Sequence, residues 1–134
     1  MRIAPLVALL TTSLMTGCMT GGAHTAAAPP APSPALVKAL AGRTPGAPVS
    51  CISLTDIRSS RIIDTRTIIY EAGSRRWYVN QPPGGCAGLA PSRALVTSTT
   101  TTSLCRGDII RVIDPPNPMT FGSCGLGEFV PYTK

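Results

Sequence analysis

The sequence predicts an all-β fold: a small antiparallel barrel or sandwich of about six short strands, with two disulfides, preceded by a disordered linker. Short runs of β-branched residues alternate with Pro- and Gly-rich turns from residue 49 to 134, and none of these runs has a helical period. Four cysteines lie in the same region, whereas the segment before it is rich in Ala and Pro. A closed barrel has no exposed strand edges, so we favour the barrel over the sandwich.

The strands are expected where β-branched and aromatic residues cluster between turn residues. Residues 67–71 and 75–80 flank the turn Ala72–Ser74 and form the clearest hairpin. The Pro- and Gly-rich segment 81–88 is expected to be a loop, and 115–118 a turn. Further strands are expected at 61–64, 94–100, 108–114 and 128–132.

Residues 1–17 are typical of a secretory signal peptide. Arg2 gives a positive start, and an apolar block too short to span a bilayer follows it. Leu14–Cys18 resembles a lipobox, in which the thiol of Cys18 takes a diacylglyceryl group and its freed amine a further chain such as palmitate. The alternative is an ordinary signal peptide that is cut later, after Ala28. Met19 behind the cysteine favours the outer membrane, so we predict a lipid-anchored protein of the cell envelope that faces the periplasm.

Residues 18–48 are predicted to be the lipidated cysteine followed by a flexible tether. The segment is Ala- and Pro-rich and contains too few apolar residues to offset the entropy of ordering. Residues 35–41 could form two helical turns, with Ser33 as the cap, Pro34 at the first position and Gly42 at the end. Alone, a helix this short is marginal.

The four cysteines of residues 49–134 predict two disulfides, because the chain is expected in an oxidising compartment. A zinc site is disfavoured since these cysteines lie far apart in the sequence, and a catalytic thiol is disfavoured since the one histidine is His24 in the tether. Four cysteines allow three pairings, and the spacing does not decide among them. Of the three we expect Cys51 with Cys124, which would tie the two ends of the domain, and Cys86 with Cys105.

Several short motifs within residues 49–134 are similar to those of a family of small exported proteins of Gram-negative bacteria, known as a domain of unknown function with four cysteines. The resemblance implies the domain boundary and the paired cysteines. It implies no activity and no catalytic residue. The motifs are Cys51–Ile52, the strand 61–64 followed by Thr67–Ile68, Tyr78–Asn80, Cys86–Leu89, Leu104–Ile110 and Cys124–Phe129.

Residues 49–134 contain no histidine, which excludes Ser-His-Asp and Cys-His catalysis and a histidine-based metal site within them. We expect no cofactor and no metal. Six carboxylates remain, and a pair facing one cleft would make a small periplasmic enzyme that acts on cell-wall or glycan material. Their spacing does not bring any two together. The six are Asp56, Asp64, Glu71, Asp108, Asp114 and Glu128.

The chain has a formal net charge of +6, and several of its arginines lie close together in the predicted hairpins. A cluster on one face would bind phosphate, lipid headgroups or an acidic cell-wall polymer, although a solvated sheet face is the simpler interpretation. The export signal argues against a nucleic-acid partner. The candidate anion-binding residues are Arg58, Arg61, Arg66, Arg75 and Arg76.

These observations favour a non-catalytic binding or structural module of the envelope over the carboxylate-based enzyme. The sequence leaves the ligand open, and an envelope protein is an alternative partner to an anionic polymer. An exposed apolar patch near Trp77 or Phe129 would favour a third function, that of an accessory subunit of an envelope assembly.

Overall fold

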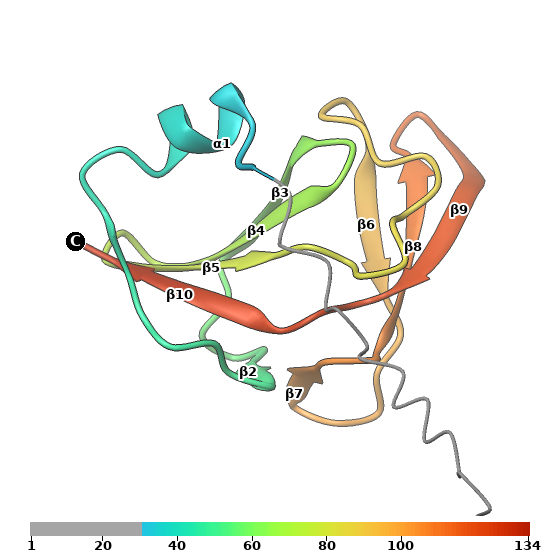
Figure 1. The fold of residues 1–134 in the computed structure, drawn as a ribbon. Coiled ribbons are helices and arrows are strands. Elements are labelled where there is room, and N and C mark those ends of the chain that lie inside the picture. The colour runs from blue at the N-terminus through green and yellow to red at the C-terminus, as the bar shows by residue number, and fades with distance from the viewer. Residues whose placement is uncertain (1–30) are drawn as a thin grey trace, which may run out of the picture. The chain divides into compact units, whose positions relative to one another are not determined.

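Ten short strands and one helix make up the part of the chain that the computed structural model describes, residues 31–134 (Figure 1). The predicted signal peptide and the lipidation site Cys18 lie outside the described residues. The predicted all-β class is confirmed. The elements are α1 (Pro34–Ala39), β1 (Thr44–Pro45), β2 (Cys51–Ser53), β3 (Ser59–Asp64), β4 (Thr67–Ala72), β5 (Arg76–Asn80), β6 (Ala94–Thr97), β7 (Ser103–Cys105), β8 (Ile109–Asp114), β9 (Asn117–Gly125) and β10 (Phe129–Thr133).

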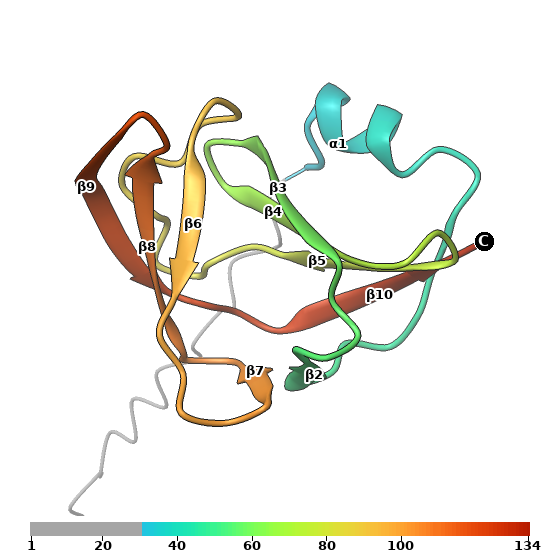
Figure 2. The same ribbon diagram turned by 180° about the vertical axis from the view of Figure 1, so that it is seen from behind.

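The strands form three antiparallel sheets. The largest has five strands in the order β1-β10-β5-β4-β3, the second has the order β6-β8-β9, and β2 pairs with β7 in the third. Figures 1 and 2 show the five-stranded and three-stranded sheets on opposite sides of the domain, with β2 and β7 at one end. The predicted barrel is wrong, because no ladder of hydrogen bonds joins the three sheets of residues 31–134 into a single closed sheet. Closure would need a continuous ladder around the whole domain.

The main core fills the space between the three sheets. Each sheet supplies fully buried side chains, such as Phe129 from β10, Ile110 from β8 and Leu104 from β7, all with an exposed fraction of 0%. Tyr70 and Phe129 pack edge to face, with ring centroids 5.8 Å apart. Burial of such side chains contributes roughly 1.5–3 kcal/mol each.

A second, smaller core lies on the other face of the five-stranded sheet, where α1 covers Ile69 and Val79 with Leu36. Strand β4 is therefore buried on both faces, because its neighbouring residues Ile68 and Ile69 point into different cores. Helix α1 begins as the sequence predicts, with Ser33 as N-cap accepting a hydrogen bond from the amide of Leu36.

The tether does not extend to residue 48 as predicted, because the compact unit begins at Ala31. Several contacts hold the segment, among them the packing of Leu36 into the second core and the addition of β1 to the sheet, which pairs Thr44 with Thr133 and Pro45 with Tyr132. Considered alone the helix is marginal. The apolar second face of β4 gives it a surface on which to fold.

The two predicted disulfides are confirmed, but the expected pairing is wrong. Strand β2 lies opposite β7, and this register places Cys51 directly across from Cys105, with 4.0 Å between the Cα atoms. Cys86 in the loop after β5 bonds to Cys124 in β9, with 5.1 Å between the Cα atoms. The same loop approaches β9 so closely that a Cβ on Gly122 would lie 2.3 Å from the carbonyl oxygen of Ala87. Glycine is required there.

Asn80 at the end of β5 binds the backbone of the segment that joins β9 to β10. Its amide nitrogen donates to the carbonyl oxygens of Gly127 at 2.8 Å and of Glu128 at 3.3 Å, and its side-chain oxygen accepts from the amide of Gly127 at 3.0 Å. The side chain is 0% exposed. These three hydrogen bonds fix the path of the chain between β9 and β10.

Candidate functional site

A cavity of about 390 Å³ lies beside the turn that joins β4 to β5. Its wall comes from the ends of both strands and from the loop before β3, which the backbone hydrogen bond from the amide of Arg58 to the carbonyl of Glu71 (2.8 Å) holds in place. Within β5, Arg76 and Tyr78 are two residues apart and so lie on the same face of the sheet, and Ala72 pairs with Arg76 across the hairpin. The lining residues are Asp56, Arg58, Ala72, Gly73, Arg75, Arg76 and Tyr78.

The cavity is strongly basic. Three arginines and one aspartate line it, so the wall carries an excess of positive charge. Within residues 31–134, no ion pair and no side-chain hydrogen bond engages Arg58, Arg75 or Arg76. Their guanidinium groups are therefore available to a ligand. Arginine binds carboxylate and phosphate with two parallel hydrogen bonds, a geometry that a point charge cannot give.

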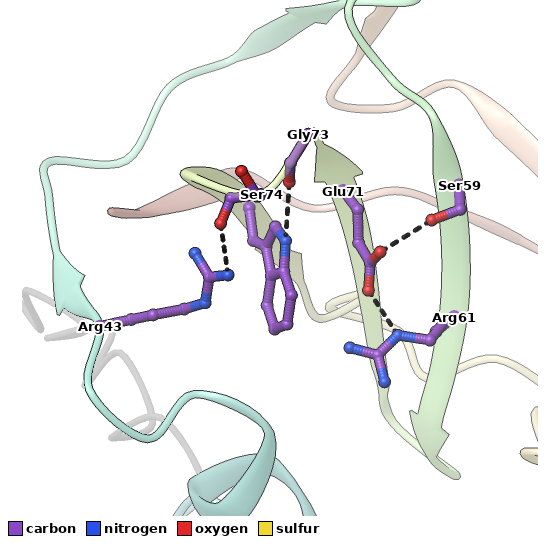
Figure 3. Close-up of polar contacts among 7 residues, drawn as sticks. Arg43, Ser59, Arg61, Glu71, Gly73 and Ser74 are labelled. Carbon is purple, nitrogen blue, oxygen red and sulfur yellow. Dashed lines mark hydrogen bonds and ion pairs between the residues drawn. The ribbon is translucent and has the colours of Figure 1, made fainter. Parts of the chain in front are cut away.

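The structure brings together three of the five arginines that the sequence suggested. Arg61 lies on the opposite face of the sheet from the cavity, where its Nε donates to Glu71 at 2.6 Å (Figure 3). Arg66 lies in the turn between β3 and β4, at the other end of that hairpin, and its backbone amide donates to Asp64 at 2.8 Å. Neither residue lines the cavity. The proposed five-arginine cluster is thus wrong, and Arg58, Arg75 and Arg76 remain.

A clamp formed by Arg43 and Trp77 holds the turn that forms one wall of the cavity (Figure 3). Arg43 donates to the carbonyl oxygens of Ser74 at 2.9 Å and of Arg75 at 3.3 Å, while Trp77 Nε1 donates to that of Gly73 at 3.0 Å. The guanidinium carbon of Arg43 lies 3.5 Å from the centroid of the Trp77 ring. Gly73 itself has φ +72°, which other residues rarely adopt. Three successive carbonyl groups are therefore fixed, and with them the backbone that carries Arg75 and Arg76.

Tyr78 supplies the aromatic part of the wall. It is half-buried, and its ring packs against the main core. Its partner across the hairpin is Tyr70, which is buried and whose hydroxyl has no hydrogen-bond partner among the described residues. Burial raises the pKa of Tyr70, so this phenol stays neutral.

Asp56 is the one acid among residues 31–134 that lines this cavity. Glu71 and Glu128 form ion pairs with arginines, and Asp108 accepts from the amide of Cys105 at 2.7 Å. The carboxylates are thus distributed over the domain, and no second acid faces Asp56 across the cavity as a paired-carboxylate mechanism would require.

Asp64 has a structural position between β3 and α1. Its Oδ2 accepts from the hydroxyl of Ser33, the residue that caps α1, at 2.5 Å. Burial alone would raise the pKa of Asp64, but hydrogen bonds from Ser33, the Arg66 amide and Thr67 outweigh it and lower the pKa below the ordinary value. Asp64 therefore holds the start of α1 as an anion.

Among the described residues, neither Trp77 nor Phe129 itself supplies an exposed apolar surface, although Val49 across from Phe129 is 38% exposed. Phe129 is 0% exposed in the main core, and the ring of Trp77 is covered by Arg43. Within the part of the chain that the structure describes, no helix is long and apolar enough to cross a membrane.

The sequence suggested Asp56 only as one of six carboxylates for a catalytic pair, not as a neighbour of the arginines, and it placed Arg43 in the tether. The expected turn at Ala72–Ser74 did indicate that Arg75 and Arg76 would stand at a hairpin end. Comparison of the chain with protein-family models, with curated proteins and with solved structures finds no match. The cavity is therefore the feature from which a function can be inferred.

Proposed function

We propose that the protein is a non-catalytic binding module of the cell envelope, anchored by lipid at Cys18, and that its cavity takes an anionic group. The observation that carries the proposal is the convergence of Arg58, Arg75 and Arg76 on one cavity with their guanidinium groups unpaired within residues 31–134. Arg61, by contrast, is engaged by Glu71 in an ion pair. An excess of arginines over acids in one cavity raises the local concentration of an anion.

Support for the envelope location comes from the sequence. A short apolar block ending at Cys18 is what a lipoprotein signal peptidase recognises, and disulfides form in oxidising compartments. The two disulfides of the described domain agree with export. Anionic groups are abundant in the bacterial envelope, both on lipid headgroups and on polymers, so the proposed ligand and location are compatible.

Binding is tested by titrating the full chain, in detergent micelles, with inorganic phosphate and following the arginine side-chain resonances by NMR. We expect the signals of Arg75 and Arg76 to move in a saturable way, and Arg76→Gln to weaken binding about tenfold, since a charge-assisted hydrogen bond is worth roughly 1.5–3 kcal/mol. The matched control is Arg111→Gln, which removes an exposed arginine of β8 remote in sequence from the cavity. Equal weakening by both variants would mean that only net charge matters, and the proposal would fail.

The anchor is tested separately by metabolic labelling with palmitate. The full chain should incorporate the label and the Cys18→Ser variant should not. Labelling that persists in Cys18→Ser, or none in the parent chain, would remove the lipid anchor from the proposal without affecting the cavity.

A further inference from the structure

The composition of the cavity wall narrows the class of anion, given the function proposed above. Three arginines would suit any phosphate or carboxylate, but Asp56 lies among them. An aspartate carboxylate accepts hydrogen bonds and repels other anions. Its presence is unfavourable for a bare anion, and favourable for a ligand that carries hydroxyl groups next to its negative charge.

The size of the cavity agrees with a ligand larger than a lone phosphate. Its volume of about 390 Å³ lies within the range of small-molecule sites. Since a water molecule occupies ~30 Å³ in the liquid, this space holds on the order of ten waters. That is the scale of a sugar ring with an anionic substituent. A bare phosphate would contact one part of the wall and leave the rest to solvent.

Tyr78 adds an aromatic surface to the hydrogen-bond donors and the acceptor of the cavity wall. An aromatic ring offers apolar surface and a hydroxyl in one side chain with few rotatable bonds, and it is held by packing against the main core. The C–H groups of a sugar ring can lie against such a surface while its hydroxyls reach polar neighbours. The cavity wall therefore offers a partner for each kind of group on an anionic sugar. The anionic group matches the donors of Arg58, Arg75 and Arg76. The hydroxyl groups match the acceptor Asp56, and the C–H groups match the ring of Tyr78.

The position of the cavity allows the sugar to be part of a polymer. Asp56, Arg58, Gly73, Arg75 and Arg76 are exposed, whereas Ala72 and Tyr78 are half-buried, so the site is open to solvent on one side. An open site can receive one residue of a chain that continues on both sides. We infer that the cavity binds a sugar that carries a carboxylate or a phosphate, as a residue of an acidic envelope glycan, with Asp56 receiving its hydroxyl groups.

The inference is tested by calorimetric titration of the full chain in detergent micelles with four probes: glucuronic acid, glucose 1-phosphate, neutral glucose and inorganic phosphate. We expect one or both charged sugars to bind at least about tenfold more tightly than either glucose or phosphate. The first two probes distinguish a carboxylate from a phosphate substituent. The variant Asp56→Asn gives the decisive comparison, because its two expected effects have opposite signs.

In Asp56→Asn, the affinity for the charged sugar should fall several-fold, because a charged acceptor for the hydroxyls is lost. The affinity for inorganic phosphate should rise, because a repelling charge is removed. The matched control Asp114→Asn, at the end of β8 and outside the cavity lining, should change neither affinity. If Asp56→Asn strengthens the binding of sugar and phosphate alike, the cavity is an anion site without sugar specificity, and only this inference fails. If no probe binds, the proposed function fails as well.

Discussion

The buried amide of Asn80 gives the sharpest test of the fold, through the substitution Asn80→Asp. The change is nearly isosteric and keeps the oxygen that accepts from the Gly127 amide. It replaces the donor that serves the carbonyls of Gly127 and Glu128 with a second oxygen. Two carbonyl groups would then face a carboxylate at a site with 0% exposure.

The expected loss is about 4 kcal/mol at pH 7. Each of the two lost hydrogen bonds leaves a buried acceptor unsatisfied, which costs roughly 1–3 kcal/mol, and the buried charge adds to this. For a domain of this size each kcal/mol lowers the melting temperature by roughly 4 °C or more, so we expect a decrease of at least about 15 °C. Such a loss is a large fraction of the ~5–15 kcal/mol that stabilises a typical protein.

The pH dependence of the stability of Asn80→Asp shows whether the buried carboxylate causes the loss. An aspartate has a pKa of about 3.9 in the unfolded chain, and burial against two carbonyls raises the pKa of the introduced carboxyl in the folded state. The destabilisation is therefore complete above the folded pKa and decreases as the pH falls towards the unfolded value, because a neutral carboxyl again donates one hydrogen bond.

The assay is thermal unfolding followed by near-ultraviolet circular dichroism at several pH values between about 4 and 7, with the disulfides intact. Asn117→Asp is the matched control, since it makes the same chemical change at an exposed position of β9. A melting temperature of Asn80→Asp within a few degrees of the parent chain at pH 7, or a difference that does not shrink at low pH, would refute the reasoning.

Three further predictions follow from contacts described above. Because the folded pKa of Asp64 is lowered, the hydrogen bond from Ser33 to this carboxylate stabilises α1 above about pH 4, and the stabilisation is lost as the pH falls through the folded pKa. The helical Cα chemical shift of Leu36 should decrease in that pH range, and Asp64→Asn should abolish this acid transition. Replacing Cys86 and Cys124 together by serine opens a loop of 38 residues, and chain entropy predicts that the free energy of unfolding, measured in urea, falls by about 4 kcal/mol. In the parent chain, a non-reduced digest that links Cys86 to any other cysteine would contradict the pairing. Arg43→Lys keeps the charge but removes the flat guanidinium group from the ring of Trp77, the single tryptophan of the chain. Acrylamide should then quench the tryptophan fluorescence more strongly, while the free energy of unfolding changes by about 1 kcal/mol or less. Unchanged quenching would count against the clamp.

The β4–β5 hairpin was predictable from sequence because its signals are local. A β-branched run in β4 and an aromatic-containing run in β5 flank a Gly-Ser turn. Strand β9 was missed because prolines and Asn117 led us to predict a turn at 115–118, where the strand begins. Gly122 is in fact a strand residue whose missing side chain makes room for Ala87, a contact made by a segment far away in the sequence.

The candidate site was predicted only in part for the same reason: local sequence patterns do not show contacts between distant segments. Local sequence placed Arg75 and Arg76 at a hairpin end, but it did not determine which face of the sheet Arg61 of β3 occupies. Arg61 lies across from Ile69, and Glu71, two residues further along β4 on the same face, forms an ion pair with it. Arg43 reaches the site only because α1 folds onto the second face of β4, and the disulfide pairing depends on β2 meeting β7. Contacts between distant segments decide these features, and one sequence does not encode them in any local pattern.

The burial of β4 on both faces has a consequence for how the domain opens. This strand lies between β3 and β5, so its amides are bonded within the sheet, and cores cover it above and below. Local fluctuations that fray β1 or separate β2 from β7 leave both faces covered, and detachment of α1 uncovers only the face of Ile69 while Ile68 stays in the main core. Its amide protons should exchange with solvent only when the whole domain unfolds, and they should be the slowest of the described chain. The exchange rate of Ile68 and Ile69 then reports the global stability of the domain, while faster exchange elsewhere reports local opening.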